Sequence, residues 1–264
     1  MNLQRLRKGT QVLTIILVIL IPVLNKNGIT VITGSLYSFA IGPVWITDPL
    51  IGFQTILTTL TADRTLLLSM VLPVLLALAL GRVFCGWACP QNSISEFVDF
   101  AAMKLGIKRP LGKRTTAFPR FIVLTAILLG TSLLGLPLAS LLSAPGIISV
   151  QTAKLIYEGT VGLELGLAAL IILFEFFVVR RGWCNYVCPV GSFLGIFRFK
   201  KSLKVVFSEE GEHVCGKCLA CVEACGLGLN PMEPGIYPQC HNCGACISAC
   251  EKMRAEKKPL IFRF

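Results

Sequence analysis

Eight of the twelve cysteines stand near the C-terminus in two copies of one spacing. Each copy has three cysteines separated by two residues and a fourth after three more: Cys215, Cys218, Cys221 and Cys225, then Cys240, Cys243, Cys246 and Cys250. In two-cluster ferredoxins the first three cysteines of such a run bind one [4Fe–4S] cluster and the fourth binds the other. The spacing therefore predicts one cluster on Cys215, Cys218, Cys221 and Cys250, and a second on Cys240, Cys243, Cys246 and Cys225.

Paired zinc sites are the alternative for these eight residues. Zinc ligands typically come as CxxC pairs with longer spacers, so the observed spacing favours clusters. The pattern departs from that of bacterial ferredoxins in one respect, since Gly226 and Glu251 stand where a proline follows the fourth cysteine. The missing prolines affect the expected reduction potential of the clusters more than the prediction of which cysteines bind them.

The other four cysteines form a second repeated motif. Cys85-Gly-Trp-Ala-Cys89-Pro90 matches Cys184-Asn-Tyr-Val-Cys188-Pro189 at an offset of 99 residues. Cysteines four apart share one face of a helix, and the proline suits the first turn of a following helix. The four thiols can converge as a site for iron, an iron–sulfur cluster or zinc. They can also act as redox thiols or pack as small buried residues, and the spacing does not choose.

The composition places these motifs in a membrane protein. Of the 264 residues 54% are hydrophobic and 15% are charged, and the mean hydropathy is +0.74. Four apolar stretches predict membrane-spanning helices, at about Thr10–Leu24, Thr65–Phe84, Arg120–Leu142 and Val161–Val179. The fold class expected is an α-helical membrane protein with four spans as two repeated hairpins, residues 1–204, and a ferredoxin-like domain with two [4Fe–4S] clusters, residues 205–264.

Basic residues predict the orientation. With both termini in the cytoplasm, only Lys26, Arg64 and Lys154 among the lysines and arginines fall on the outer side. All twelve cysteines then face the reducing compartment, where metal ligation is favoured over disulfides. The net charge of +11 follows from this topology, and no recognition motif for nucleic acid accompanies it. We expect a multi-pass protein of the bacterial inner membrane whose first span is an uncleaved anchor.

Missing motifs narrow the chemistry further. His213 and His241 are the only histidines and both lie in the tail, so the spans cannot hold a bis-histidine haem. No CxxCH or dinucleotide fingerprint occurs. Electrons would therefore move through iron–sulfur centres and a diffusible carrier. The segment Gly28–Asp63 carries four aromatic residues, Tyr37, Phe39, Trp45 and Phe53. Most aromatic residues in such a segment belong to an interfacial belt, and only a minority would line a quinone pocket.

The double CxxxCP motif, four spans and two-cluster tail together resemble the NapH family of ferredoxin-type membrane proteins. The resemblance implies a quinol dehydrogenase component that passes electrons from the quinol pool towards a periplasmic nitrate reductase, with a periplasmic iron–sulfur partner called NapG. It carries over to Cys85, Cys89, Cys184 and Cys188 and to the eight tail cysteines.

Two functions follow as hypotheses. The first is an electron-transfer subunit that oxidises quinol only together with partner subunits, using the two [4Fe–4S] clusters and a third iron or iron–sulfur centre if the CxxxCP cysteines hold one. The second is an assembly or maturation factor that reduces a metal or a disulfide in a partner respiratory enzyme. The sequence identifies neither the catalytic and quinol-binding residues nor the type of quinol.

Overall fold

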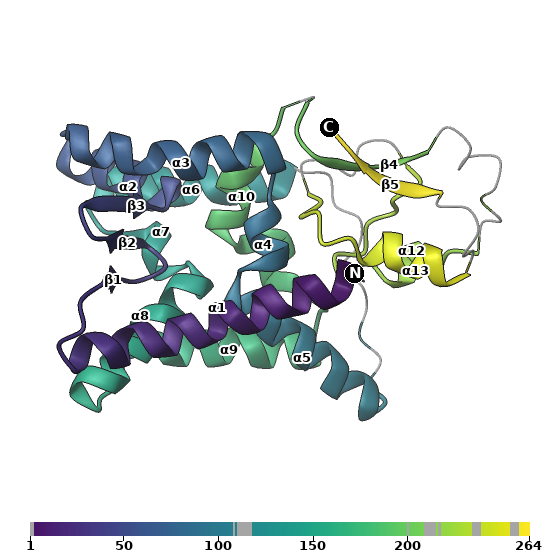
Figure 1. The fold of residues 1–264 in the computed structure, drawn as a ribbon, viewed down its shortest axis with the longest axis horizontal. Coiled ribbons are helices and arrows are strands. Elements are labelled where there is room, and N and C mark those ends of the chain that lie inside the picture. Colours follow the sequence, from purple (N-terminus) through teal and green to yellow (C-terminus); the bar gives the residue numbers. More distant parts are fainter. Residues whose placement is uncertain are drawn as a thin grey trace.

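The computed structural model describes residues 3–107, 109, 118–199, 201–208, 215, 218–233, 239–253 and 259–264. Their fold is mainly helical, with two small sheets (Figure 1). The helices are α1 Leu3–Lys26, α2 Pro49–Thr59, α3 Arg64–Leu80, α4 Val83–Trp87, α5 Pro90–Lys104, α6 Phe118–Leu134, α7 Leu138–Leu141, α8 Ala144–Glu158, α9 Glu164–Phe177, η1 Trp183–Val187, α10 Pro189–Ile196, α12 Ala220–Glu223 and α13 Ala245–Met253. The strands are β1 Ile32–Gly34, β2 Ser38–Ile41, β3 Val44–Thr47, β4 Lys204–Phe207 and β5 Leu260–Arg263.

Each of the four predicted spans contains a helix. Helix α1, with 24 residues, is the one helix in the described ranges that is long and apolar enough to cross a membrane by itself. Helices α3 and α6 have 17 residues and α9 has 14, so they are shorter than the stretches predicted. Helix α3 stops before Gly81 and α6 before Gly135, two glycines with positive φ, and such residues commonly end helices.

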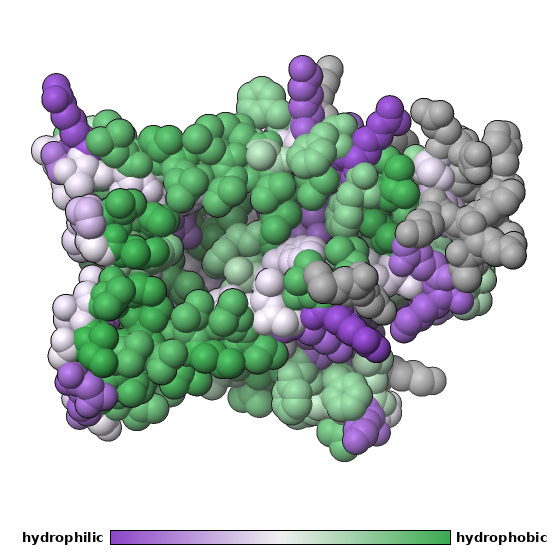
Figure 2. Space-filling model, in the orientation of Figure 1, coloured by the Kyte–Doolittle hydropathy of each residue, from purple (hydrophilic) through white to green (hydrophobic). Residues whose placement is uncertain are grey.

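The outer surface of these helices is apolar. Leu68 is 72% exposed and Leu133 is 83% exposed, and many other large hydrophobic side chains point outward from α1, α3, α6 and α9. Figure 2 shows this hydrophobic surface over the helical part, with hydrophilic residues gathered towards its two ends. In water such a surface would be costly, whereas in a bilayer it faces lipid tails.

The aromatic segment Gly28–Asp63, between the first two apolar stretches, is folded. Strands β1, β2 and β3 form an antiparallel sheet in which Ser38 pairs with Thr47, and helix α2 follows it. Asp48 caps α2 by accepting a hydrogen bond from the Leu50 amide at 2.8 Å, and Pro49 opens the helix. The sheet lies at one end of the helices and the cysteine-rich tail at the other (Figure 1).

The tail is a small unit held by its own sheet and core. Strand β4 pairs antiparallel with β5, with Val205 opposite Phe262. Cys221, Cys246, Ile247 and Leu260 are buried together with Val205. Strand β4 begins at Lys204, so the predicted boundary after residue 204 lies inside this strand. His213 lies outside the described residues.

Candidate iron–sulfur centres

Both CxxxCP motifs adopt one local arrangement. Cys85 lies in the short helix α4, and Cys89 precedes α5, which opens on Pro90. Cys184 lies in the π-helical turn η1, and Cys188 precedes α10, which opens on Pro189. A proline at the first helical position loses no hydrogen bond, and short π-helical segments often mark functional sites. In each motif a turn carrying the first cysteine thus ends where the second cysteine starts a new helix.

The four cysteines of the two motifs line a single small cavity. Cys85, Cys89, Cys184 and Cys188 contribute to its wall together with the buried amides Gln91 and Asn92. Cys89 is buried and the other three are partly buried. The fold therefore brings together thiols that are 99 residues apart in the sequence, which is the convergence that the spacing predicts.

Two buried arginines stand beside this cavity. Arg82 is 3% exposed and lines it, and Arg120 is 4% exposed. A methyl group added at Gly191, another lining residue, would lie 2.5 Å from the Arg82 Nη2 and 3.5 Å from the Arg120 Nη2. The Arg120 Nε donates to the Ser192 hydroxyl at 3.3 Å, while its buried Nη2 makes no hydrogen bond to a described residue. Both cations suit a site that binds negative charge.

The four cysteines predicted to bind the second tail cluster also line one cavity. Cys225, Cys240, Cys243 and Cys246 line it with the aliphatic residues Val205, Leu227 and Leu229. These are the four cysteines whose spacing predicts one cluster, with the fourth cysteine of the first run joining three of the second. Burial in this apolar surrounding raises the pKa of Cys240 to about 12.

The first tail group is described in part. Burial, followed by the nearby charges of Cys250 and Cys215, raises the pKa of Cys221, so these three thiols lie close together. The Cys215 sulfur is 3.9 Å from the Met232 sulfur. Cys218, the fourth predicted ligand, has an exposed side chain, and residues 216 and 217 beside it lie outside the described ranges.

The donor chemistry fits iron–sulfur clusters. All twelve cysteines are within the described residues and none forms a disulfide. Burial also raises the pKa of Cys188 to about 11, so cluster assembly has to displace protons from such thiols. In the described ranges no three His, Cys, Asp or Glu side chains lie together as ligands of a single metal ion. A four-iron cluster holds its thiolates further apart than a single metal ion does.

The cavity lined by the CxxxCP cysteines and the cavity in the tail are neighbours. Leu227 and His241 line both of them. Gly86, between the cysteines of the first motif, packs so closely on the tail that an added methyl group would lie 2.7 Å from the His241 carbonyl oxygen. The Trp87 indole donates to the Asn242 carbonyl at 2.9 Å.

Two arginines at equivalent positions before the two motifs contact the residues on either side of the tail cavity. Arg82 donates to the Gln239 carbonyl at 2.9 Å, directly before Cys240. Arg181, its counterpart at the offset of 99 residues, packs against Gly226, directly after Cys225. Sequence reasoning missed these roles. The position of each arginine three residues before a cysteine in both motifs is the signal that could have indicated them.

Asn242 joins the tail to the end of α3. It is 1% exposed, and its amide nitrogen donates to the carbonyls of Leu80 at 2.9 Å and Leu203 at 2.6 Å. Its φ of 52° lies in the left-handed region that asparagine tolerates better than most residues. No signal in the sequence distinguishes this asparagine from an ordinary turn residue between Cys240 and Cys243.

Comparison with known proteins agrees with an iron–sulfur site. A protein family described as "4Fe-4S binding domain" matches twice, over residues 64–108 and 161–205, and each range contains one CxxxCP motif. The ferredoxin-type protein NapH of Escherichia coli (strain K12) is 27% identical over 78% of this chain and 72% of its own length. NapH of Haemophilus influenzae is 26% identical, covering 86% and 77%.

A further relative comes from a different system. The methylamine utilization ferredoxin-type protein MauN of Methylorubrum extorquens is 35% identical over 75% of this chain and 67% of its own length. No solved structure matches the chain.

Proposed function

The chain belongs to the NapH family of ferredoxin-type proteins, and we propose that it is the membrane electron-transfer subunit of a quinol dehydrogenase. In this role it takes electrons from the quinol pool and passes them through iron–sulfur centres towards a periplasmic reductase, by resemblance a nitrate reductase. Its partner would be a periplasmic iron–sulfur protein like NapG.

Three sets of cysteines would hold the centres. The tail would hold two [4Fe–4S] clusters, one on Cys215, Cys218, Cys221 and Cys250 and one on Cys225, Cys240, Cys243 and Cys246. A third would be held by Cys85, Cys89, Cys184 and Cys188. When bound, such clusters supply one-electron transfer at potentials set by charge, hydrogen bonds and burial. The cysteines of the second tail cluster and those of the third centre each line a cavity. Two buried arginines lie beside the cavity of the third centre.

The observation that carries this proposal is the contact between the CxxxCP cavity and the tail cavity. Because Leu227 and His241 belong to the walls of both, centres held there would be adjacent. Adjacent centres are what an electron-transfer subunit needs. The arrangement also supports an exchange of electrons between the membrane part and a tail that would otherwise be isolated on the cytoplasmic side.

The arrangement of the helices supports a multi-pass topology with both termini in the cytoplasm. The start of α1 lies against the tail, where the Gln4 amide donates to the Cys243 carbonyl at 3.1 Å. The end of α3 meets the same region through Leu80, and Arg120 near the start of α6 lies beside the CxxxCP cavity. Successive apolar helices therefore run in alternating directions between two ends, as four spans would.

An assembly factor that exchanges thiols with a partner is less well supported. Thiol exchange needs an accessible, reactive thiolate. Here Cys89 is buried and all four membrane cysteines line an internal cavity. Burial also raises the pKa of Cys188, which reduces its thiolate fraction at neutral pH.

Iron and sulfide analysis with EPR tests the proposal on anaerobically purified protein. We expect about twelve irons per chain, four for each of three clusters, and about eight in a Cys85→Ser/Cys184→Ser variant. In the presence of its iron–sulfur partner protein, a quinol analogue should reduce the clusters of the wild type and not those of the variant. Eight irons in both proteins would remove the third centre from the proposal, and a wild type that no quinol analogue reduces with the partner present would refute quinol oxidation.

A further inference from the structure

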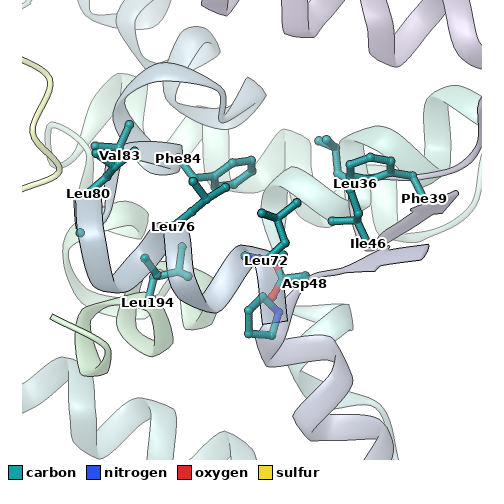
Figure 3. A pocket seen from close by; sticks show the side chains of 14 residues that line it. Leu36, Phe39, Ile46, Asp48, Leu72, Leu76, Leu80, Val83, Phe84 and Leu194 are labelled. Carbon is teal, nitrogen blue, oxygen red and sulfur yellow. The ribbon is translucent and has the colours of Figure 1, made fainter. Parts of the chain in front are cut away.

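An apolar groove lies between the outer sheet and the CxxxCP cavity. Its volume is about 390 Å³, within the usual range for sites that bind small organic molecules. Leu36, Phe39 and Ile46 gather at one end, and Leu80, Val83 and Phe84 at the other (Figure 3). Helix α3 forms one wall along the length of the groove.

The groove is reached from the apolar outer surface of α3. Leu72 and Leu76 line it and are 49% and 50% exposed. Their neighbour Leu75 on the same helix is 55% exposed but is not part of the lining. A hydrophobic molecule dissolved in the surrounding lipid could therefore enter past Leu72 and Leu76 without crossing water.

One carboxyl group lies in this apolar wall. Among the described residues that line the groove, Asp48 is the only ionisable one. Its Oδ1 accepts from the Leu50 amide at 2.8 Å, and a carboxylate has further lone pairs available for a hydroxyl donor. Burial raises the pKa of Asp48 to about 6. The carboxyl thus combines a structural capping role with exposure to whatever occupies the groove.

The inner end of the groove leads to the proposed third centre. Phe84, which lines it, directly precedes Cys85, and Leu194 belongs to the helix that follows Cys188. Residues that neighbour both CxxxCP motifs in the sequence therefore form the inner end of the groove. An occupant that reaches this end would contact Phe84, the neighbour of Cys85.

We propose that this groove is the quinol-binding site, with a quinol hydroxyl donating a hydrogen bond to the Asp48 carboxyl and the prenyl chain leaving past Leu72 and Leu76. The inference rests on the proposed function, which requires a quinol but does not place it. A phospholipid is the competing occupant. Its phosphate would be repelled by Asp48, and in the part of the chain that the structure describes no lysine or arginine lines the groove to compensate that charge.

The test is direct binding of a short-chain quinol analogue to the anaerobically purified holoprotein. Leu76→Trp should fill the groove and weaken binding at least tenfold, while Leu75→Trp, with similar exposure on the same helix, should leave binding within twofold. Asp48→Asn keeps a helix-capping side chain and removes the carboxylate, and we expect it to weaken quinol binding about tenfold. Iron content and melting temperature, unchanged from the wild type, confirm that each variant is folded.

The outcomes separate the two proposals. Wild-type binding that Leu76→Trp and Asp48→Asn leave intact would overturn the groove as the site while leaving quinol oxidation standing. A wild type that neither binds the analogue nor oxidises it in the presence of its iron–sulfur partner protein would overturn the proposed function as well. Native mass spectrometry that finds a phospholipid retained in wild type and in Leu75→Trp, but lost in Leu76→Trp, would assign the groove to lipid instead.

Discussion

Two buried arginines distinguish the CxxxCP site from a mere cluster of small residues. Arg82 and Arg120 are almost fully enclosed, and both guanidinium groups lie near Gly191 on the wall of the cavity. An isolated cation in such a place is costly. Four cysteinates holding a cluster would supply the opposite charge. The arginines would then compensate the negative charge of the cluster, and the cluster would compensate the buried positive charge of the arginines.

The burial of Arg120 beside the CxxxCP cysteines leads to a prediction for Arg120→Gln. Removing one buried cation near the cluster should lower its reduction potential, because the reduced, more negative state loses a stabilising charge. An interaction of about 1.4 kcal/mol corresponds to a shift of ~59 mV for one electron. EPR-monitored redox titration measures it. Arg64→Gln, at an exposed position on α3, is the matched control and should leave the potential unchanged. Equal potentials in all three proteins would contradict the electrostatic role.

Helix α5 shows how an element can join the two repeats through polar rather than apolar contacts. Its Asp99 forms ion pairs with Arg109 at 3.0 Å, Arg180 at 3.0 Å and Arg181 at 3.1 Å. Glu96, one turn earlier, pairs with Arg7 of α1. Ion pairs from the charged face of α5 therefore connect this helix both to α1 and to the arginines that precede the second CxxxCP motif.

Asp99→Asn should destabilise the protein strongly. The substitution leaves three arginines around a neutral side chain, and breaking a buried ion pair by removing one partner costs about 3–5 kcal/mol. Thermal unfolding in detergent, followed by loss of helical circular dichroism, measures the effect. Asp63→Asn is the control, since Asp63 is exposed and makes no capping hydrogen bond to α3. A melting temperature as high for Asp99→Asn as for Asp63→Asn would show that the network contributes little.

The sequence predicts those elements whose signal is local. Cysteine spacing predicted the grouping around the tail cavity, and apolar runs predicted the helices α1, α3, α6 and α9. Helix α5 was missed because its buried face carries Gln91, Asn92, Ser95 and Asp99, so that hydrophobic periodicity points to the wrong side. Their partners come from distant arginines, which no local pattern links to them. The folded outer segment was missed because its strands have only three or four residues each.

At the scale of the whole molecule, the tail packs directly on the helical part that carries the CxxxCP motifs. The carbonyl and the side chain of His241 occupy the space where a methyl group on Gly86 would lie. The Asn242 amide donates a hydrogen bond to the end of α3. The way the two parts dock determines that Leu227 and His241 belong to both cavities. No spacing in either part could predict that arrangement.

Gly86→Ala tests this docking. The added methyl group would contact the His241 carbonyl at 2.7 Å, so the tail must shift, at a cost of about 1–3 kcal/mol. We expect increased proteolysis of the tail and weaker magnetic coupling between the reduced centres by EPR. Gly9→Ala on α1 has no atom within 4 Å of the added group and should preserve both signals. Unchanged coupling in Gly86→Ala would show that the two parts can dock without this close approach.

The contact between Gln4 and Cys243 joins residues at opposite ends of the chain. During synthesis the first helix leaves the ribosome more than two hundred residues before the cysteine loop that completes its surroundings. Until that loop arrives, Arg7 and Gln11 can reach α5 and α4 but the tail side of α1 stays uncovered. The tail side of α1 is therefore covered only after the cysteine-rich loop around Cys243 has been made.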